Sequence, residues 1–381
     1  MLTAEGCALR RRRLWDALPC PCDLLIVGSP EHLIYFADFV PSPFVFRSNE
    51  AAGVLVMEPG RAILVADDMI GPFVEASHVD EKVTPSWYNG DCEAPDRRGL
   101  LVKSTLETLA SLPGKTIGVE LSGVPSGIVE GLRAARRGVE IVDITPVIRP
   151  LRRAKDADEI AAISRAIRAG EAGQKAALAL VRPGMTELDV YAIVLSAAIQ
   201  EAGRPVILYG DFASGPRCEI EKGGSPTSRV IEPGDLLLLD FSVIIDGYRG
   251  DFTNTFAVGG EPSSAQLDLF NACMAAFNAA ESKLKAGSPA REVHEAVVAA
   301  FTEHTFAHLF PHHTGHGIGL AHPEPPYFVP HSGETLMVGD VVAVEPGLYA
   351  ERIGGMRFEK NYLITADGFE TLSRHELRIK Q

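Results

Sequence analysis

The sequence lacks several features that define other classes of protein. No segment contains about 18 consecutive apolar residues, the length that a membrane-spanning helix needs, so we expect no transmembrane segment. The basic residues near the start are not followed by the apolar core of an export signal. No internal repeat or low-complexity stretch is visible. We therefore expect a globular protein of the cytoplasm.

Cysteine is scarce and scattered. The six cysteines have no zinc-site spacing, and one residue separates Cys20 from Cys22, which is too tight for an ordinary redox motif. Free thiols in a reducing compartment are the simplest interpretation.

Basic residues are fewer than acidic ones. The chain has 36 Lys and Arg and 50 Asp and Glu, which gives a net charge of −14. A nucleic-acid partner is not expected, since phosphate binding needs a basic surface. The four arginines at 10–13 do not reverse this balance. We interpret them as the solvated face of a first helix that turns Leu9, Leu14 and Leu18 inward.

The length of 381 residues predicts two domains, because single cores stop growing at about 250–300 residues. Short apolar runs between residues 23 and 143 alternate with helical patterns, which predicts an α/β domain with a mixed or parallel sheet. A Pro-rich basic stretch then precedes Asp156 and Asp158, either of which can cap a long helix, as Thr186 can cap the next one. We place the boundary here, giving domains 1–150 and 151–381.

Two aspartates flank a predicted hairpin turn. An apolar run leads into Asp240, and residues 244–248 have the composition of a turn that precedes Asp251. The hairpin would bring the two carboxylates side by side. A buried carboxylate is costly unless it is paired or bound to a metal. For the pair alone, solvated strand ends remain the alternative.

Three further segments each offer a candidate metal ligand. His316 is surrounded by glycines, which allow close approach of the backbone and leave the imidazole free to coordinate. Glu345 ends an apolar run and is followed by a Pro-Gly turn. Residues 356–362 alternate in character and predict one strand with Arg357 and Glu359 on the same face. Together with the two aspartates, these side chains form the ligand set of a paired divalent-metal site.

At this point the chain resembles the creatinase, aminopeptidase P and methionine aminopeptidase superfamily, the pita-bread metallopeptidases. The motifs follow in that family's order and spacing, closely from about residue 153 and in outline before it. The resemblance implies a creatinase-like α/β domain at 1–150 and an α+β pita-bread catalytic domain at 151–381. The five family metal ligands fall on Asp240, Asp251, His316, Glu345 and Glu359.

The resemblance also implies a role for each ligand. Asp240 would bind one metal and His316 and Glu345 the other, with Asp251 and Glu359 bridging both. A hydroxide held between the ions would be the nucleophile, and Glu345 would pass the proton to the leaving amine. An oxygen-rich set with one imidazole suits two Mn²⁺ ions, with Co²⁺, Fe²⁺ or Zn²⁺ as alternatives. The lack of a thiolate argues against structural zinc.

The surroundings of these ligands depart from the family pattern. Proline-specific members carry a histidine that stabilises the developing oxyanion, and Gly223 occupies that position here. Losing such a donor typically costs about 10²- to 10³-fold in rate. A second family histidine is replaced by Pro323, and the nearest imidazole is His322, one residue earlier. His312 matches a family position near the substrate.

Two other residues close in sequence to the expected metal ligands also differ from the family pattern. Ser242 replaces a glycine after the first aspartate, and Asn254 replaces an arginine after the second. We interpret Arg357 as a residue that orients Glu359 or Glu345, because ligating carboxylates are themselves commonly hydrogen-bonded.

Three functions follow. An Xaa-Pro peptidase of the aminopeptidase P or prolidase type is favoured. An enzyme acting on a small non-peptide substrate, as creatinase, ectoine hydrolase and the dimethylsulfoniopropionate lyases of the superfamily do, is supported by Gly223. A catalytically silent binding module is disfavoured by the complete ligand set, because buried carboxylates without metal are destabilising. The resemblance implies a homodimer, and the expected catalytic residues are Glu345, His312 and His322.

Overall fold

The structure is a computed structural model that describes residues 1–221 and 223–381. The chain divides into two compact units, Met1–Arg152 and Arg153–Gln381. Among the described residues, no helix combines the length and the apolar character required to cross a membrane.

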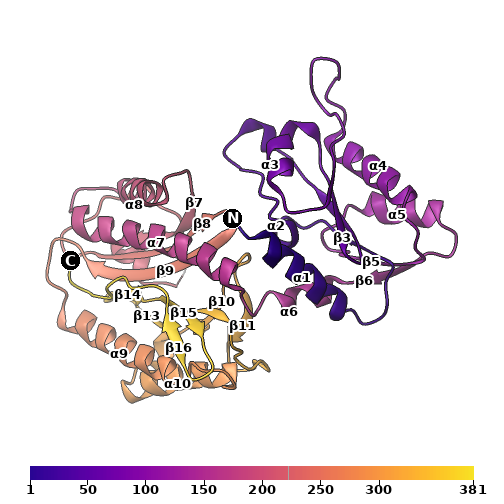
Figure 1. Ribbon diagram of the computed structural model, residues 1–381. Coiled ribbons are helices and arrows are strands. Elements are labelled where there is room, and N and C mark those ends of the chain that lie inside the picture. Colours follow the sequence, from indigo (N-terminus) through magenta and orange to yellow (C-terminus); the bar gives the residue numbers. More distant parts are fainter. Residues whose placement is uncertain (222) are drawn as a thin grey trace. The chain divides into compact units, whose positions relative to one another are not determined.

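The first unit is a mixed six-stranded sheet with helices on both faces (Figure 1). Its elements are α1 (Ala4–Asp16), β1 (Leu24–Val27), α2 (Pro30–Ala37), η1 (Phe46–Ser48), β2 (Val54–Glu58), β3 (Arg61–Val65), η2 (Asp68–Ile70), α3 (Gly71–Ala76), β4 (Glu81–Val83), α4 (Arg97–Ala110), β5 (Thr116–Val119), α5 (Ser126–Ala135), β6 (Glu140–Asp143) and α6 (Thr145–Leu151). The strand order is β4-β3-β2-β1-β5-β6, with β1, β5 and β6 parallel and β2 antiparallel to both of its neighbours. All four residues of β1 are buried, because both faces of the sheet are covered. The predicted α/β domain is confirmed, although the short edge strand β4 was not predicted.

The interpretation of α1 is wrong at two positions. Arg10 is fully buried rather than solvated, and Leu9 is exposed. The guanidinium of Arg10 donates from Nε to the carbonyl oxygen of Tyr35 at 2.7 Å and lies 5.2 Å from the centroid of that ring. These partners offset the cost of burying a charge, which the pattern of leucines does not reveal.

The second unit is layered around two antiparallel sheets. Its elements are α7 (Ala157–Leu180), α8 (Glu187–Ala202), β7 (Ile207–Ser214), η3 (Gly215–Cys218), β8 (Leu236–Ile245), β9 (Tyr248–Ala257), α9 (Ser264–Glu281), α10 (Ala290–Glu303), η4 (Ala307–Leu309), β10 (Gly315–Gly317), β11 (Glu324–Phe328), β12 (Val341–Val344), β13 (Gly347–Ala350), β14 (Gly354–Arg357), β15 (Lys360–Ile364) and β16 (Phe369–Thr371). The strand orders are β7-β8-β9 and β11-β10-β12-β15-β16, with β13 and β14 forming a separate pair. In Figure 1, α7 and α8 cover one side of the sheet β7-β8-β9, and the yellow strands lie on its other side, followed by α9 and α10.

Glycines permit the close contact between α7 and the sheet. A Cβ atom at Gly170 would lie 2.0 Å from the ring of Phe252 on β9, and one at Gly250 would lie 2.9 Å from the backbone of Ile167. The predicted helix starts are confirmed, because Asp156 and Thr186 both form capping boxes with acidic residues at N3.

The predicted single strand across residues 356–362 is wrong. β14 ends at Arg357, and β15 begins at Lys360 in a different sheet. The amide of Phe358 donates to the carbonyl of Pro346 at 3.3 Å, and that of Glu359 donates to the carbonyl of Thr253 at 2.9 Å. These bonds fix the crossing between the sheets, and alternation along the sequence does not show them.

Candidate metal centre

The hairpin β8–β9 brings the two aspartates onto one face. Asp246 and Gly247 form its two-residue turn with φ values of 52° and 86°, which gives the tight reversal that the sequence predicts. The register pairs Asp240 with Thr253 and Ser242 with Asp251. Because alternate residues of a strand share a face, both carboxylates point to the same side of the sheet.

The other three candidate ligands come from the second sheet and its connections. His316 is the central residue of β10, Glu345 directly follows β12, and Glu359 lies in the crossing between β14 and β15. Glycine is required on both sides of His316. A Cβ atom at Gly315 would lie 2.1 Å from the carbonyl of Ala343, and one at Gly317 would lie equally close to the carbonyl of Pro325.

The five side chains line one cavity of about 380 Å³. Their donor atoms form two overlapping groups, in which all atoms of a group lie within 4.8 Å of one another: Asp240, Asp251 and Glu359, and His316, Glu345 and Glu359. Glu359 belongs to both groups. The arrangement therefore offers adjacent positions for two cations with a shared carboxylate.

The donor set fits divalent metal ions. Oδ2 of Asp251 and Oε1 of Glu345 are buried, and imidazole nitrogens lie beside them: that of His322 at 3.0 Å from Asp251, and those of His313 and His316 at 3.3 Å from Glu345. Buried carboxylates are costly unless they are paired or bound to a metal. Four carboxylates and an imidazole are the hard, oxygen-rich donors that Mn²⁺ and similar ions prefer.

Electrostatics also favour a cation here. Burial, and then the charges of Asp251, Glu345 and Asp240, raise the pKa of Glu359 well above its ordinary value. Burial and the neighbouring carboxylates likewise raise the pKa of Asp240 to about 6, although Arg357 opposes the shift. Both shifts express the cost of crowding negative charge in a buried site, which bound cations would remove.

Near His316, by contrast, the pKa shifts favour the charged forms of the side chains. Burial raises the pKa of Glu345, but hydrogen bonding and the charge of His316 outweigh it, so the net pKa is lowered. Burial lowers the pKa of His316, but Glu345 reverses the effect and raises it to about 9. The two side chains are 3.3 Å apart, between Nε2 and Oε1. Glu345 is thereby held as a carboxylate, the form that accepts a proton.

Arg357 pairs with Glu345, one of its two predicted partners, and also with residues that were not predicted. Its guanidinium donates to Oδ2 of Asp240 and, at 2.6 Å, to the hydroxyl of Tyr349. Its Nε lies 3.8 Å from Glu345, and no contact with Glu359 is present among the described residues. Asp211, directly opposite Asp240 in the β7–β8 register, is 3.5 Å from the same guanidinium. Only the position of β7 reveals this second carboxylate, and the sequence analysis did not predict that strand.

Three further histidines line the cavity. Nδ1 of His312 donates to the carbonyl of His313 at 2.6 Å, which leaves its buried Nε2 as an acceptor without a partner among residues that the structure describes. Burial lowers its pKa to about 4. Nε2 of His322 lies 3.0 Å from Oδ2 of Asp251, so this displaced imidazole does reach the cavity. Nδ1 of His313, which the sequence analysis did not select, is 3.3 Å from Glu345.

The altered residues differ in their relation to the site. The hydroxyl of Ser242 donates to Oδ1 of Asp251 at 2.9 Å and so orients a candidate ligand. Asn254 lies on the opposite face of β9 and bonds to the carbonyl of Glu376. A Cβ atom at Gly223 would meet the Cβ of Ala213 at 2.8 Å, so a histidine would need space that this chain does not provide.

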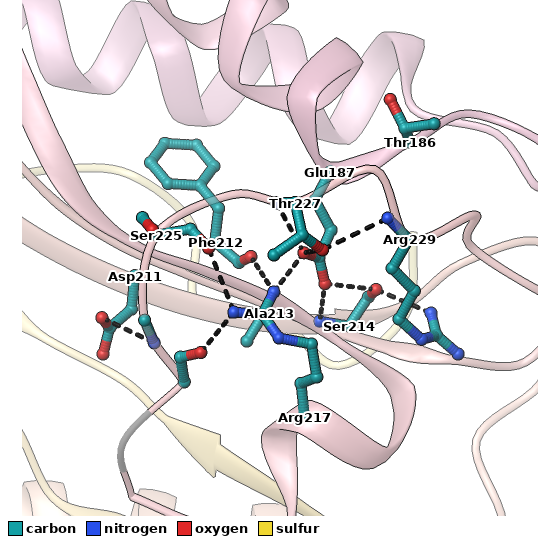
Figure 2. Close-up of polar contacts among 12 residues, drawn as sticks. Thr186, Glu187, Asp211, Phe212, Ala213, Ser214, Arg217, Ser225, Thr227 and Arg229 are labelled. Atoms are coloured by element: carbon teal, nitrogen blue, oxygen red, sulfur yellow. Dashed lines mark hydrogen bonds and ion pairs between the residues drawn. The ribbon is translucent and has the colours of Figure 1, made fainter.

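A buried ion pair holds the loop that contains Gly223 (Figure 2). Glu187 is fully buried, pairs with Arg217 and accepts hydrogen bonds from the backbone and hydroxyl groups of Ser214 and Thr227 at 2.6–3.0 Å. Arg217 in turn donates to three carbonyl oxygens, those of Phe212, Gly223 and Ser225. The loop places Glu221 at the wall of the candidate metal cavity.

Comparison with known proteins agrees with this site. Residues 161–366 match the model of metallopeptidase family M24, and residues 21–154 match the creatinase/prolidase N-terminal domain. The chain is 30% identical over 267 residues to an Xaa-Pro dipeptidase of Pyrococcus horikoshii, covering 69% of this chain and 74% of the relative. It is 27% identical over 352 residues to an uncharacterized peptidase of Bacillus subtilis, covering 92% and 93%. The solved structure of an Xaa-Pro dipeptidase from Bacillus anthracis matches with a TM-score of 0.83 and 25% identity over 100% of both chains.

The fold and site thus define a metal-dependent hydrolase of the peptidase class. The chain belongs to metallopeptidase family M24, and the pita-bread domain that the motifs predict is confirmed together with a creatinase-type N-terminal domain.

Proposed function

We propose that this protein is an Xaa-Pro peptidase that uses two divalent metal ions, held by Asp240, Asp251, His316, Glu345 and Glu359. The observation that carries the proposal is the convergence of these five side chains on one cavity, where their donor atoms form two groups that share Glu359. The proline specificity rests on the relative from Pyrococcus horikoshii and on the structure from Bacillus anthracis, both of which are Xaa-Pro dipeptidases.

Metal ions bound here would supply a nucleophilic water at neutral pH and polarise the scissile carbonyl. Glu345, kept ionised by its histidine neighbours, would accept a proton and deliver it to the leaving amine. The unpaired Nε2 of His312 would accept a hydrogen bond from a substrate N–H group, since its lowered pKa keeps the ring neutral. His322 would hold Asp251 in position through its contact at 3.0 Å.

Mn²⁺ is the metal we propose, because the donor set contains four carboxylates and no thiolate. A cytoplasmic location is supported by six cysteines that are all free. A homodimer is supported by a patch of exposed apolar side chains in the first unit: Phe44, Val45, Phe46 and Tyr88. Such patches commonly mark interaction surfaces.

A small non-peptide substrate is the second candidate, and Gly223 is the observation that favours it. Its position lacks the oxyanion donor of proline-specific relatives, and the neighbouring Ala213 leaves little room for one.

The two candidates differ in the products that they predict. Mn²⁺-loaded protein should release free amino acid from Xaa-Pro and Xaa-Pro-Yaa peptides, and Asp251→Ala should not. If protein with two metals per chain cleaves none of the peptides, the peptidase proposal is wrong and a small-molecule hydrolase or lyase takes its place.

A further inference from the structure

An arginine beside the candidate metal centre has no role in the mechanism proposed above. Arg249 is 8% exposed and lies on β9, two residues before Asp251. Because alternate residues of a strand share a face, its side chain points to the same side of the sheet as the carboxylate of Asp251.

The guanidinium of Arg249 has few partners. Its Nη1 donates to the hydroxyl of Tyr209 at 2.7 Å, whereas its buried Nε has no hydrogen-bond partner among the described residues. A buried charge is costly unless an opposite charge pairs with it. An anion bound at this guanidinium would therefore remove an unfavourable contribution.

The acidic side chains closest to Arg249 in the β8–β9 hairpin have other partners. Asp246 pairs with Arg204 at 2.9 Å, and Asp251 lies 3.0 Å from a ring nitrogen of His322. Within the described part of the chain, no carboxylate forms an ion pair with Arg249.

Tyr209 connects this guanidinium to the candidate metal cavity. Its side chain is 46% exposed and lines the cavity of about 380 Å³. On the sheet, Tyr209 of β7 pairs with Ser242 of β8, which in turn pairs with Asp251. The phenol oxygen accepts the hydrogen bond from Arg249, so its own proton is available to a ligand in the cavity.

Asp211 and Glu221, two acids outside the ligand set, lie away from Arg249. Arg249 pairs with Ile244 of β8, whereas Asp211 pairs with the residue four positions earlier on that strand. Four residues of a strand span about 13 Å. Glu221 belongs to the loop whose Gly224 amide donates to Asp211 at 2.9 Å. An anion at Arg249 therefore lies far from the carboxylate of Asp211.

We propose that Arg249 and Tyr209 bind a carboxylate of the substrate. A carboxylate accepts several hydrogen bonds at once, and the charge of a guanidinium strengthens those that it donates. Which carboxylate this is rests on the proposed peptidase function. In Xaa-Pro the C-terminal carboxylate follows the scissile bond by one residue, and Arg249 stands about 7 Å along β9 from Asp251. The pair then selects dipeptides that end at proline over longer peptides.

Cleavage of Ala-Pro and of Ala-Pro amide by the full-length, Mn²⁺-loaded protein tests this selection. The wild type should have a kcat/KM at least about tenfold higher for Ala-Pro, through a lower KM, because the amide lacks the negative charge. Arg249→Met should lose this preference with unchanged metal content, and Arg249→Lys, which keeps the charge, should retain part of it. A purely structural role of Arg249 would lower the cleavage of both substrates equally.

Two further variants complete the comparison. Tyr209→Phe removes the second donor at an exposed position and should reduce the preference severalfold. Arg204→Met removes an exposed arginine that pairs with Asp246 at the hairpin turn, and should keep the preference of the wild type. Circular dichroism establishes that each variant is folded, and Tyr209→Phe decides the question if Arg249→Met is not.

Titration calorimetry with ligands that are not cleaved separates this proposal from the peptidase function. Glutarate, which carries a second carboxylate, should bind the Mn²⁺-loaded wild type at least about tenfold more tightly than butyrate does, and Arg249→Met should bind the two with similar affinity. If no peptide is cleaved but this difference is found, the peptidase function is wrong and the carboxylate subsite stands. A wild type that cleaves Ala-Pro and its amide equally well, or an Arg249→Met variant that keeps the preference for the free acid, would overturn the proposal. If no peptide is cleaved, an equal gain from the second carboxylate of glutarate in the wild type and in Arg249→Met would overturn it.

Discussion

Replacing Glu359 by Gln should have opposite effects on stability with and without metal. The substitution preserves the shape of the side chain and keeps an acceptor for the hydroxyl of Thr253, which donates to Glu359 at 2.8 Å. It removes one negative charge from a buried cluster in which the donor atoms of Asp240, Asp251 and Glu359 lie within 4.8 Å of one another. Two unit charges at 4.8 Å repel by about 3.5 kcal/mol at an effective dielectric constant of about 20.

The pH dependence follows from the raised pKa of Glu359, which burial and the neighbouring carboxylates cause. Because the folded state holds this proton more tightly than the unfolded chain, the wild-type protein without metal loses stability as the pH rises above the unfolded pKa of about 4.3. The neutral amide in Glu359→Gln carries no such cost. At about pH 8 and without metal we expect the variant to be about 1–3 kcal/mol more stable, which raises Tm by about 2–10 °C.

Added Mn²⁺ should reverse the order. A metal that binds the folded state at about 100 times its Kd stabilises the wild type by about 2.7 kcal/mol, and the variant should gain far less because a shared ligand is gone. Thermal unfolding with chelator and with Mn²⁺ measures both effects. Glu370→Gln, at an exposed position of β16, is the matched control. A variant that is less stable than the wild type without metal, or that gains equally from Mn²⁺, would refute the reasoning.

Two further predictions concern the same cavity. Because burial and neighbouring carboxylates raise the pKa of Asp240 to about 6, protons should compete with the metal below that pH. We expect the Mn²⁺ affinity, measured by titration calorimetry, to fall about tenfold per pH unit below about 6; an affinity that does not change between about pH 7 and 5 would contradict this. Arg217→Met should raise KM about tenfold or more with unchanged metal content, because three loop carbonyls lose their donor. Arg204→Met, which removes an exposed pair with Asp246, should leave KM unchanged; a lower metal content or an unchanged KM in Arg217→Met would show that the loop does not act on the substrate cavity.

Much of the fold could be predicted because local patterns agree with the tertiary structure. The capping residues Asp156 and Thr186 are local signals, since the side chain bonds to backbone amides within the next turn. The hairpin between Asp240 and Asp251 is also local, because its two-residue turn fixes the register. These signals depend on neighbours in the sequence, and the structure agrees with them.

The remaining features depend on residues far apart in the chain. Arg10 is buried because Tyr35 supplies its partners, and no pattern within α1 indicates that contact. The strand break near Phe358 arises from hydrogen bonds to other segments. The pairing of Arg357 with Asp240, and the nearby carboxylate of Asp211, become visible only when the β7–β8 register is known.

The most direct test of the account is an anomalous diffraction map of crystals of the Mn²⁺-loaded protein. The account predicts two peaks per chain in the cavity of the second unit, one bound by Asp240 and the other by His316 and Glu345, with Asp251 and Glu359 contacting both. A single peak, or peaks that Asp251 and Glu359 do not share, would contradict the paired metal centre on which the proposed peptidase depends.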